Sequence, residues 1–211
     1  EQAVLDTVRE LARPPRSQLA AQRLFDLVTA LVGVVVFLVP ALLIAVVVKC
    51  TSSGPVLFIQ RRVGRGGHEF TVYKFRTMRH GTHQEILADE RARQAYRDND
   101  FKLPPDDPRI TGIGRLLRKT SLDELPQLIN VIQGKMSIVG VRPLLAEEVA
   151  IRPAYDQALY RCMRPGMTGL WQVEGRSTVR STDRLQLDRT YLENWSVWVD
   201  IKIAIRTPFA L

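Results

Sequence analysis

The hydropathy pattern is dominated by one run of 22 residues, from Leu27 to Val48, that contains no charged side chain. At 1.5 Å per residue, a continuous helix of this length would extend about 33 Å, close to the hydrocarbon thickness of a bilayer. Pro40 lies within the run, and a proline bends a helix because its nitrogen carries no hydrogen and its ring clashes with the preceding turn. We therefore expect a membrane helix that bends after Val39.

Basic residues flank this run on both sides. They are Arg13, Arg16 and Arg23 before it and Lys49, Arg61, Arg62 and Arg65 after it. Under the positive-inside rule, both flanks should lie in the cytoplasm. A re-entrant helix that enters the bilayer, breaks at Pro40 and returns to the same side satisfies this rule. A kinked helix that crosses the bilayer is the alternative, and the residue pattern alone does not separate the two.

The chain before the apolar run carries two further patterns. Apolar residues recur at helical spacing over residues 2–12, which predicts a surface helix that Pro14 and Pro15 end. Asp26 follows Arg23 by three positions, a spacing at which two side chains on a helix can form an ion pair. We therefore expect Arg23 to balance the charge of Asp26 at the membrane interface.

The remainder of the chain predicts a mainly helical α+β domain. Alternating side chains over residues 70–76 predict a strand that places Lys74 and Arg76 on one face. Periodicity over about residues 84–97 predicts a solvated helix. Aromatic and basic residues over 191–206 follow a helical pattern that is typical of a bilayer interface and also of core packing.

Composition and charge limit the class of partner and the cellular setting that we expect for the protein. The 211 residues are 45% hydrophobic and 25% charged, as in ordinary folded proteins, and the net charge of +8 indicates an anionic partner: nucleic acid, acidic lipid or a phosphorylated ligand. Cys50 and Cys162 are far apart, so they indicate neither a disulfide framework nor a zinc site, and a reducing cytoplasmic setting is expected. His80 and His83 have no third candidate ligand nearby, so we interpret them as structural residues.

Asp123 and Glu124 stand at a predicted helix start. Apolar residues at helical spacing follow them, and Gly134 is a typical helix stop. Pro126 fits without loss of a hydrogen bond only in a first turn, so the helix should begin at or near Asp123. The two acids would then lie at the positive end of the helix dipole. Simple capping is the alternative, because Ser121 and Glu124 fit a capping box.

The charges around these acids favour chemistry on phosphate. Arg109, Arg115, Arg118 and Lys119 precede the acids, and Arg142 follows on a loop bounded by glycine and proline. Arginine binds phosphate oxygens, yet a carboxylate at the same place would repel phosphate unless a divalent cation intervenes or the carboxylate itself attacks phosphorus. The pattern therefore favours phosphoryl transfer by an aspartate, with Arg, Lys and Mg2+ neutralising the transferred group.

Residues 164–176 form a second segment of interest. They are rich in turn-forming and polar residues, which predicts a loop suited to holding a ligand, with an ordinary loop as the alternative.

Seven segments taken together resemble the monotopic phosphoglycosyl transferases, a class of bacterial sugar transferases, and the resemblance covers about residues 23–207. The segments are SGPVLF (53–58), QRRVG (60–64), YKFRTM (73–78), DPRIT (107–111), LRKTSLDELPQL (117–128), MSIVG (136–140) with Arg142-Pro143, and PGMTGLWQV (165–173). The resemblance implies a re-entrant membrane helix bent at Pro40. Together with the helical pattern at the start of the chain, it predicts three parts: an N-terminal surface helix or linker (1–22), the re-entrant membrane helix (23–49), and a small cytoplasmic catalytic domain with interfacial helices (50–211).

The resemblance also implies an activity: Mg2+-dependent transfer of a sugar phosphate from a UDP-sugar to undecaprenyl phosphate, at the cytoplasmic face of the bacterial inner membrane. Asp123 is similar in position to the nucleophile that attacks phosphorus, releases UMP and forms an aspartyl-phosphosugar. Glu124 resembles its catalytic partner, and both acids are implied ligands of Mg2+. Lys74, Arg118 and Arg142 resemble the basic residues that hold phosphate.

The implied donor pocket lies in the segment from Pro165 to Gln172 and includes Thr168. The motif GLWQV is similar to the branch that transfers galactose or glucose phosphate, with an acetamido sugar as the alternative. Two positions depart from the family pattern: Val141 stands where proline is usual, and Val39 where serine is usual. The first makes the Arg142 loop less rigid, and the second leaves the sharpness of the bend open.

The expected partners are a UDP-sugar, undecaprenyl phosphate and membrane lipid, without nucleic acid. The sequence does not decide the oligomeric state, and a homodimer is one option. A non-catalytic basic protein that binds an anionic membrane surface is the competing function. A transferase that joins donor and acceptor in one ternary-complex step is a third.

Overall fold

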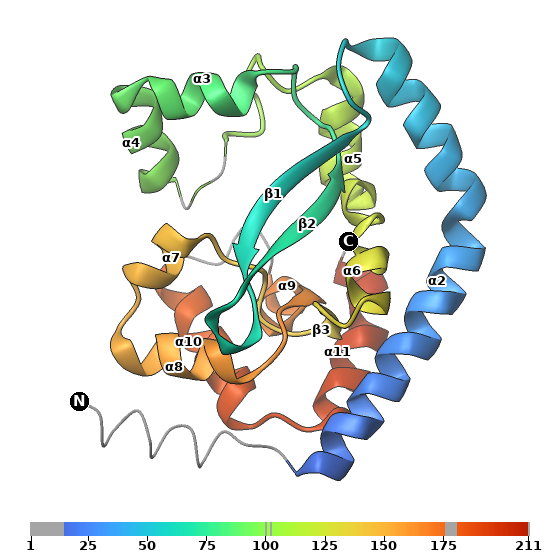
Figure 1. Cartoon of the computed structure of the whole chain (residues 1–211), viewed down its shortest axis with the longest axis vertical. Helices are drawn as coiled ribbons and strands as arrows, with labels where there is room; N and C mark the ends of the chain where they lie inside the picture. The colour runs from blue at the N-terminus through green and yellow to red at the C-terminus, as the bar shows by residue number, and fades with distance from the viewer. Residues whose placement is uncertain (1–14, 100, 102, 176–180, 211) are drawn as a thin grey trace. The chain divides into compact units, whose positions relative to one another are not determined.

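The computed structural model describes residues 15–99, 101, 103–175 and 181–210, without the side chains of 181 and 182. The surface helix predicted over residues 2–12 lies outside this part of the chain. The described residues are mainly helical with two small sheets, which confirms the predicted α+β class (Figure 1). They divide into two compact units, which are described separately below.

Unit 1 contains the residues up to Val35, Gln60–Val72 and the residues from Gln127 onward, and unit 2 contains Val36–Ile59 and Tyr73–Pro126. From Gln127 onward, unit 1 contains the helices α6 (Gln127–Ile132), α7 (Ala146–Ala150), α8 (Ala154–Cys162), α9 (Leu170–Glu174), α10 (Ser181–Glu193) and α11 (Val197–Ala210). Unit 2 holds α3 (Thr82–Ala88), α4 (Glu90–Asp98), α5 (Gly112–Thr120) and the 3-10 turn η2 (Leu122–Glu124). The hairpin strands β1 (Leu57–Val63) and β2 (Glu69–Phe75), joined through the 3-10 turn η1 (Arg65–Gly67), contribute to both units.

The predicted apolar helix is α2 (Arg16–Thr51), drawn in blue in Figure 1. By length and composition it could cross a membrane, and almost none of its most apolar stretch is buried. It therefore differs from the core helix of a soluble protein, whose apolar face is covered. Helical structure continues through Pro40, and the reversal of direction that re-entry requires stays a prediction. The helix begins at Arg16, several residues before the apolar run.

Residues 164–176 contain a strand and a short helix where the sequence predicted a loop. Strand β4 (Gly166–Thr168) pairs in parallel with β3 (Ser137–Val139), and α9 follows directly. A Cβ atom added at Gly166 would lie 2.0 Å from the backbone nitrogen of Gly140, and one at Gly169 would lie 2.3 Å from the oxygen of Gly140. The glycines of this segment thus allow two backbones to approach closely, whereas the sequence analysis interpreted them as turn residues.

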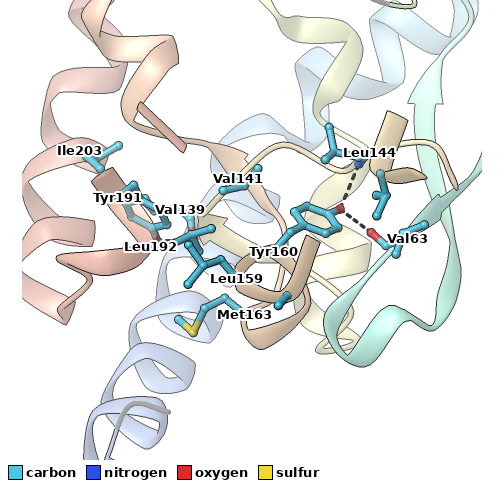
Figure 2. Close-up of a cluster of buried hydrophobic side chains, with 12 residues drawn as sticks. Val63, Val139, Val141, Leu144, Leu159, Tyr160, Met163, Tyr191, Leu192 and Ile203 are labelled. Atoms are coloured by element: carbon cyan, nitrogen blue, oxygen red, sulfur yellow. Dashed lines mark hydrogen bonds between the residues drawn. The ribbon is translucent and has the colours of Figure 1, made fainter. Parts of the chain in front are cut away.

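The largest buried cluster of unit 1 surrounds these strands (Figure 2). It includes Val139 and Leu159 with side chains from α10 and α11. The buried hydroxyl group of Tyr160 donates a hydrogen bond to the carbonyl oxygen of Val63 (2.6 Å) and accepts one from the backbone nitrogen of Leu144 (3.0 Å). Tyr160 therefore ties β1 to the segment that follows β3, and it also anchors α8 in the core.

The predicted ion pair between Arg23 and Asp26 is wrong. Asp26 is fully buried and accepts hydrogen bonds from the hydroxyl of Ser137 (2.7 Å) and the backbone nitrogen of Ile138 (2.9 Å). Arg23 instead donates to the carbonyl oxygen of Ile132 (2.7 Å), at the C-terminal end of α6. Asp26 forms its ion pair with Arg164 (3.6 Å), while Arg23 acts on it electrostatically without a direct ion pair.

The strand and helix predictions for the middle of the chain hold in part. β2 confirms the predicted strand at 70–76 to within one residue at each end. The helix predicted over 84–97 is split into α3 and α4 at Asp89, whose carboxylate accepts a hydrogen bond from the backbone nitrogen of Arg91 (2.9 Å). Aspartate is a preferred N-cap residue, so Asp89 starts a second helix where the periodicity alone predicts a single continuous helix.

The C-terminal aromatic residues differ in burial, and their predicted place at a bilayer interface stays a prediction. The indole nitrogen of Trp195 donates a hydrogen bond to buried Asp200 (3.1 Å), which is a packing role. Trp198 and Phe209 of α11 are instead highly exposed, at 72% and 88%. The exposed aromatic side chains of α11 therefore present an apolar face to the surroundings of unit 1.

Candidate active site

Four of the residues predicted for the site lie in unit 2 and are brought close together there. Lys74 comes from β2, Arg118 from the last turn of α5, and Asp123 and Glu124 from η2. The Nζ atom of Lys74 lies 2.5 Å from the Oε1 atom of Glu124. Asp123 interacts electrostatically with Lys74, Glu124 and Arg118. The site therefore combines two adjacent carboxylates with two cations.

Asp123 is the buried member of the group, with 8% of its surface exposed. Burial raises the pKa of Asp123 to about 6, with Glu124 adding to the increase while Lys74 and Arg118 oppose it. A carboxyl with such a pKa is still mostly ionised at pH 7. Asp123 is therefore a desolvated carboxylate under the electrostatic influence of two cations, a state suited to a nucleophile toward phosphorus.

Arg118 is fixed by Thr77, which was not among the residues predicted for the site. Its Nε atom donates a hydrogen bond to the hydroxyl oxygen of Thr77, 2.9 Å away, and Thr77 is buried. Burial lowers the pKa of Arg118, and the neighbouring Asp123 carboxylate opposes that change. Arginine stays charged under such perturbation because its unperturbed pKa is so high. Thr77 lies inside the segment 73–78, whose motif is the signal that could have identified it.

The segment that follows β2 holds α5 by unusually close contacts. The carbonyl oxygen of Thr77 accepts a hydrogen bond from the backbone nitrogen of Thr111 (3.0 Å). A Cβ atom added at Gly114 would lie 2.0 Å from the same carbonyl oxygen, so the first turn of α5 can approach Thr77 only because residue 114 is glycine. This contact sets the position of α5, and Arg118 one turn later can then reach the hydroxyl of Thr77.

The backbone around the acids differs from the predicted helix start. Ser121 adopts a left-handed conformation with φ of 55° and ends α5, and the α-helix α6 begins only at Gln127, after Pro126. The backbone nitrogen of Glu124 donates to the carbonyl oxygen of Ser121 (3.1 Å), while the Ser121 side chain makes no capping hydrogen bond to η2. The capping-box interpretation is therefore wrong. Asp123 and Glu124 lie in a 3-10 turn between the left-handed Ser121, which ends α5, and Pro126, after which α6 begins.

The acid pair matches what Mg2+ needs from a protein. Mg2+ is usually bound through one or two carboxylates, with substrate phosphates and water completing its coordination. Asp123 and Glu124 supply two adjacent carboxylates, and among the described residues no group of three or more His, Cys, Asp or Glu side chains forms a self-sufficient metal cage.

The rings of His83 and Phe58 meet edge to face at 5.8 Å, as expected of a structural histidine.

The remaining three predicted residues lie in unit 1. Arg142 follows β3 and forms an ion pair with Glu148. Thr168 ends β4, and its hydroxyl oxygen lies 3.0 Å from that of Thr207. Gln172 is in α9, and its buried Oε1 atom has no hydrogen-bond partner among the described residues. Glu148 was not singled out from the sequence, because a lone glutamate in a short helix gives no distinguishing signal.

Taken together, the fold and the site define a domain with a membrane-length apolar helix and a carboxylate-and-cation cluster of the kind used in phosphoryl transfer. The family model for bacterial sugar transferases matches residues 17–211, and the chain belongs to this family.

Three curated relatives illustrate the similarity. The chain is 46% identical to a UDP-galactose-lipid carrier transferase of Erwinia amylovora, over 88% of this chain and 39% of the relative. It is 43% identical to an undecaprenyl-phosphate galactose phosphotransferase of Salmonella typhimurium, over 91% of this chain and 40% of the relative. It is 40% identical to the exopolysaccharide production protein ExoY of Rhizobium meliloti, over 89% of this chain and 83% of the relative. The chain thus spans about two fifths of the length of the first two relatives.

Proposed function

We propose that the chain is a phosphoglycosyl transferase that moves a hexose-1-phosphate from a UDP-sugar to undecaprenyl phosphate, an early membrane step of exopolysaccharide synthesis. The observation that carries this proposal is the buried Asp123 carboxylate, held between Lys74 and Arg118 beside Glu124. The names of the relatives support the donor, the lipid carrier and the process.

The proposed reaction has two displacements. A carboxylate oxygen of Asp123 attacks the phosphorus that carries the sugar, and the bond from that phosphorus to the bridging oxygen of the diphosphate breaks. UMP leaves with the bonding electrons, and Asp123 is esterified as an aspartyl-phosphosugar. An oxygen of undecaprenyl phosphate then attacks the same phosphorus and breaks the bond to Asp123. The second displacement regenerates the carboxylate and yields a lipid diphosphosugar.

The chain's own cations stabilise charge in both displacements. Lys74 and Arg118 lie close enough to interact with the attacking carboxylate, so they can also neutralise the oxygens of the transferred phosphoryl group. Arg142 is proposed to hold phosphate of the donor. Asp123 and Glu124 would hold Mg2+, which when bound neutralises charge on the diphosphate and makes UMP a better leaving group.

The proposed location is the bacterial inner membrane, with the catalytic domain on the cytoplasmic face. The exposed apolar surface of α2 supports insertion, and the exposed aromatic side chains of α11 support contact with the bilayer surface. We propose that α2 is re-entrant at Pro40, with the organisation 1–22, 23–49 and 50–211. A tag inserted after Val48 should be found in the cytoplasm, and an external tag would refute re-entry.

The proposed sugar is galactose or glucose, with an acetamido sugar as the alternative. Two of the relatives are named for galactose, and the donor pocket is proposed to include Thr168 and Gln172. A panel of UDP-sugars scored by UMP release tests this choice. Preference for an acetamido sugar would overturn it.

Exchange of labelled UMP into UDP-galactose, with Mg2+ and without lipid acceptor, tests the two-step reaction. A covalent intermediate requires exchange in the unmodified protein and none in Asp123→Asn. A transferase with one ternary-complex step would form lipid product but give no exchange. A protein that only binds anionic membrane surfaces would give neither exchange nor product. Subunit number, for which a homodimer is one option, does not affect this test.

A further inference from the structure

Glu148 of α7 is a buried carboxylate at the centre of a polar cluster in unit 1. Only 6% of its side chain is exposed, yet it makes three charge-assisted contacts. Its Oε2 atom accepts hydrogen bonds from the backbone nitrogen of Leu145 (2.6 Å) and from Nη1 of Arg62 (3.0 Å). Its Oε1 atom accepts one from Nη2 of Arg142. A buried carboxylate with three donors is well compensated for the loss of water.

The side chain of Arg142 depends on this carboxylate for its orientation. Within the described part of the chain, the guanidinium group of Arg142 makes its hydrogen bond to Glu148 alone. One N–H of the five in a guanidinium is used in this way, so most of the donors stay available. The side chain of Arg142 is 21% exposed, against 11% for Arg62, so Arg142 is the arginine of this pair that a ligand can reach more easily.

The backbone on either side of Arg142 is fixed independently of its side chain. The nitrogen of Gly140 donates to the oxygen of Thr168 (2.8 Å), and the nitrogen of Val63 donates to the oxygen of Leu144 (2.9 Å). These bonds hold both ends of the segment that carries Arg142. Glu148 therefore controls the direction of the guanidinium more than the course of the chain.

The charge balance of the cluster also favours an anionic ligand. Arg62 and Arg142 share the single carboxylate of Glu148, and Arg152 forms an ion pair with Asp188 (3.0 Å) nearby. Two guanidinium groups therefore face one carboxylate at Glu148. The surplus of positive charge lies in a partly buried setting, where it attracts phosphate more strongly than it would in water.

We propose that Glu148 is a positioning residue that holds the guanidinium of Arg142 ready for the diphosphate of the donor. This inference rests on the proposed function, because it assumes that Arg142 binds the UDP-sugar. Glu148 itself does not touch the substrate. It acts by limiting the orientations of Arg142, so less conformational freedom is lost when the donor binds.

A double-mutant cycle tests this assignment with UDP-galactose as the probe. Glu148→Gln has nearly the same shape and keeps an oxygen for the nitrogen of Leu145, but it removes the charge that orients Arg142. We expect it to raise the KM for UDP-galactose about tenfold with kcat within about threefold, because uniform binding is lost. The dissociation constant measured by calorimetry should rise in parallel. Arg142→Ala should raise KM by at least as much.

The double variant distinguishes positioning from a merely structural role. If Glu148 acts through Arg142, Glu148→Gln adds less than about twofold to the effect of Arg142→Ala. Multiplication of the two effects, or a normal KM and dissociation constant for Glu148→Gln, would overturn the inference. Should Glu148→Gln not fold, Glu148→Asp replaces it. The shorter side chain keeps the charge near Arg62 but reaches Arg142 less well, and the same non-additivity with Arg142→Ala is expected.

Asp156→Asn is the matched control. Asp156 is a buried carboxylate with 3% side-chain exposure that pairs with Arg189 in the same unit, at 2.8 Å. The Asp156→Asn substitution should lower thermal stability without changing the KM for UDP-galactose. This result would separate loss of a buried ion pair from loss of donor affinity. Failure of the proposed function has a different signature: the unmodified protein itself would neither bind UDP-galactose nor release UMP. Binding and turnover in the unmodified protein with an unchanged Glu148→Gln would refute the positioning role alone.

Discussion

Thr77 and Arg118 form a contact in which a neutral hydroxyl orients a charged group. The hydroxyl oxygen accepts from the Nε atom of Arg118, while the backbone oxygen of Thr77 binds Thr111. The two functions are separable, because a side-chain substitution leaves the backbone contact in place. Thr77 therefore offers a direct way to disturb Arg118 without removing its charge.

Thr77→Val should lower kcat about tenfold, because Arg118 loses the acceptor that fixes it beside Asp123. The change is nearly isosteric but leaves the Nε–H of Arg118 without its partner. Thr77→Ser keeps the hydroxyl and should retain most of the activity. UMP release under saturating UDP-galactose measures the effect, with thermal unfolding to verify folding. Equal activity of the valine and serine variants would contradict the proposed role of Arg118.

At this scale the sequence predicted charged residues better than neutral ones. Asp123, Glu124, Lys74 and Arg118 were predicted as one site, and the structure brings all four together in unit 2. Thr77 lies in the motif of residues 73–78, but the motif does not reveal its buried contact with a residue 41 positions away. The partner of a charged group depends on tertiary packing, which residue spacing does not encode.

Secondary-structure elements were predicted where their hydrophobic period was long, and missed where close backbone contact decided the structure. The long helix α2 follows from an uninterrupted apolar run, and β2 follows from alternation. Strand β4 was interpreted as a loop because glycine is typical of turns as well as of closely packed strands. The split between α3 and α4 depends on the capping geometry of a single aspartate, Asp89.

The two glycines of α5 provide a matched prediction. Gly114→Ala should destabilise the protein by about 3 kcal/mol, because its Cβ atom would lie 2.0 Å from the backbone oxygen of Thr77. Gly112→Ala should be neutral or stabilising by up to about 1 kcal/mol, because nothing lies within 4 Å of its Cβ position and alanine favours helix. Thermal unfolding in detergent checks both. A smaller loss for Gly114→Ala than for Gly112→Ala would show that α5 does not pack on Thr77 as described.

At the scale of the whole molecule, buried polar groups link distant parts of unit 1. Asp200 is fully buried in α11 and accepts hydrogen bonds from the side chains of Gln22 (3.0 Å), Tyr191 (2.8 Å) and Trp195 (3.1 Å). Its donors are neutral, and they offset only part of the cost of burying its charge. Burial raises the pKa of Asp200 to about 6, while these donors partly oppose it.

This shift predicts how stability depends on pH. The pKa of Asp200 is higher in the folded protein than in the unfolded chain, so folding takes up a proton between about pH 4 and pH 6. The resulting stabilisation is complete below about pH 4 and is lost as the pH rises through 6. Relative to Asp200→Asn, the unmodified protein should therefore lose about 2 kcal/mol between pH 4.5 and pH 7.5. Unfolding followed by tryptophan fluorescence measures this difference, and a stability of the unmodified protein relative to Asp200→Asn that stays constant or increases toward pH 7.5 would exclude a raised pKa.

The most direct test of the account is the intact mass of the protein after incubation with UDP-galactose and Mg2+ in the absence of lipid acceptor. The account predicts a gain equal to one hexose phosphate, confined to the peptide that contains Asp123 and removed when undecaprenyl phosphate is added. Asp123→Asn should show no gain, while Thr77→Ser should show the same gain as the unmodified protein. An unmodified protein that turns over donor and lipid without ever gaining this mass, or an equal gain in Asp123→Asn, would contradict the central role of the Asp123 carboxylate.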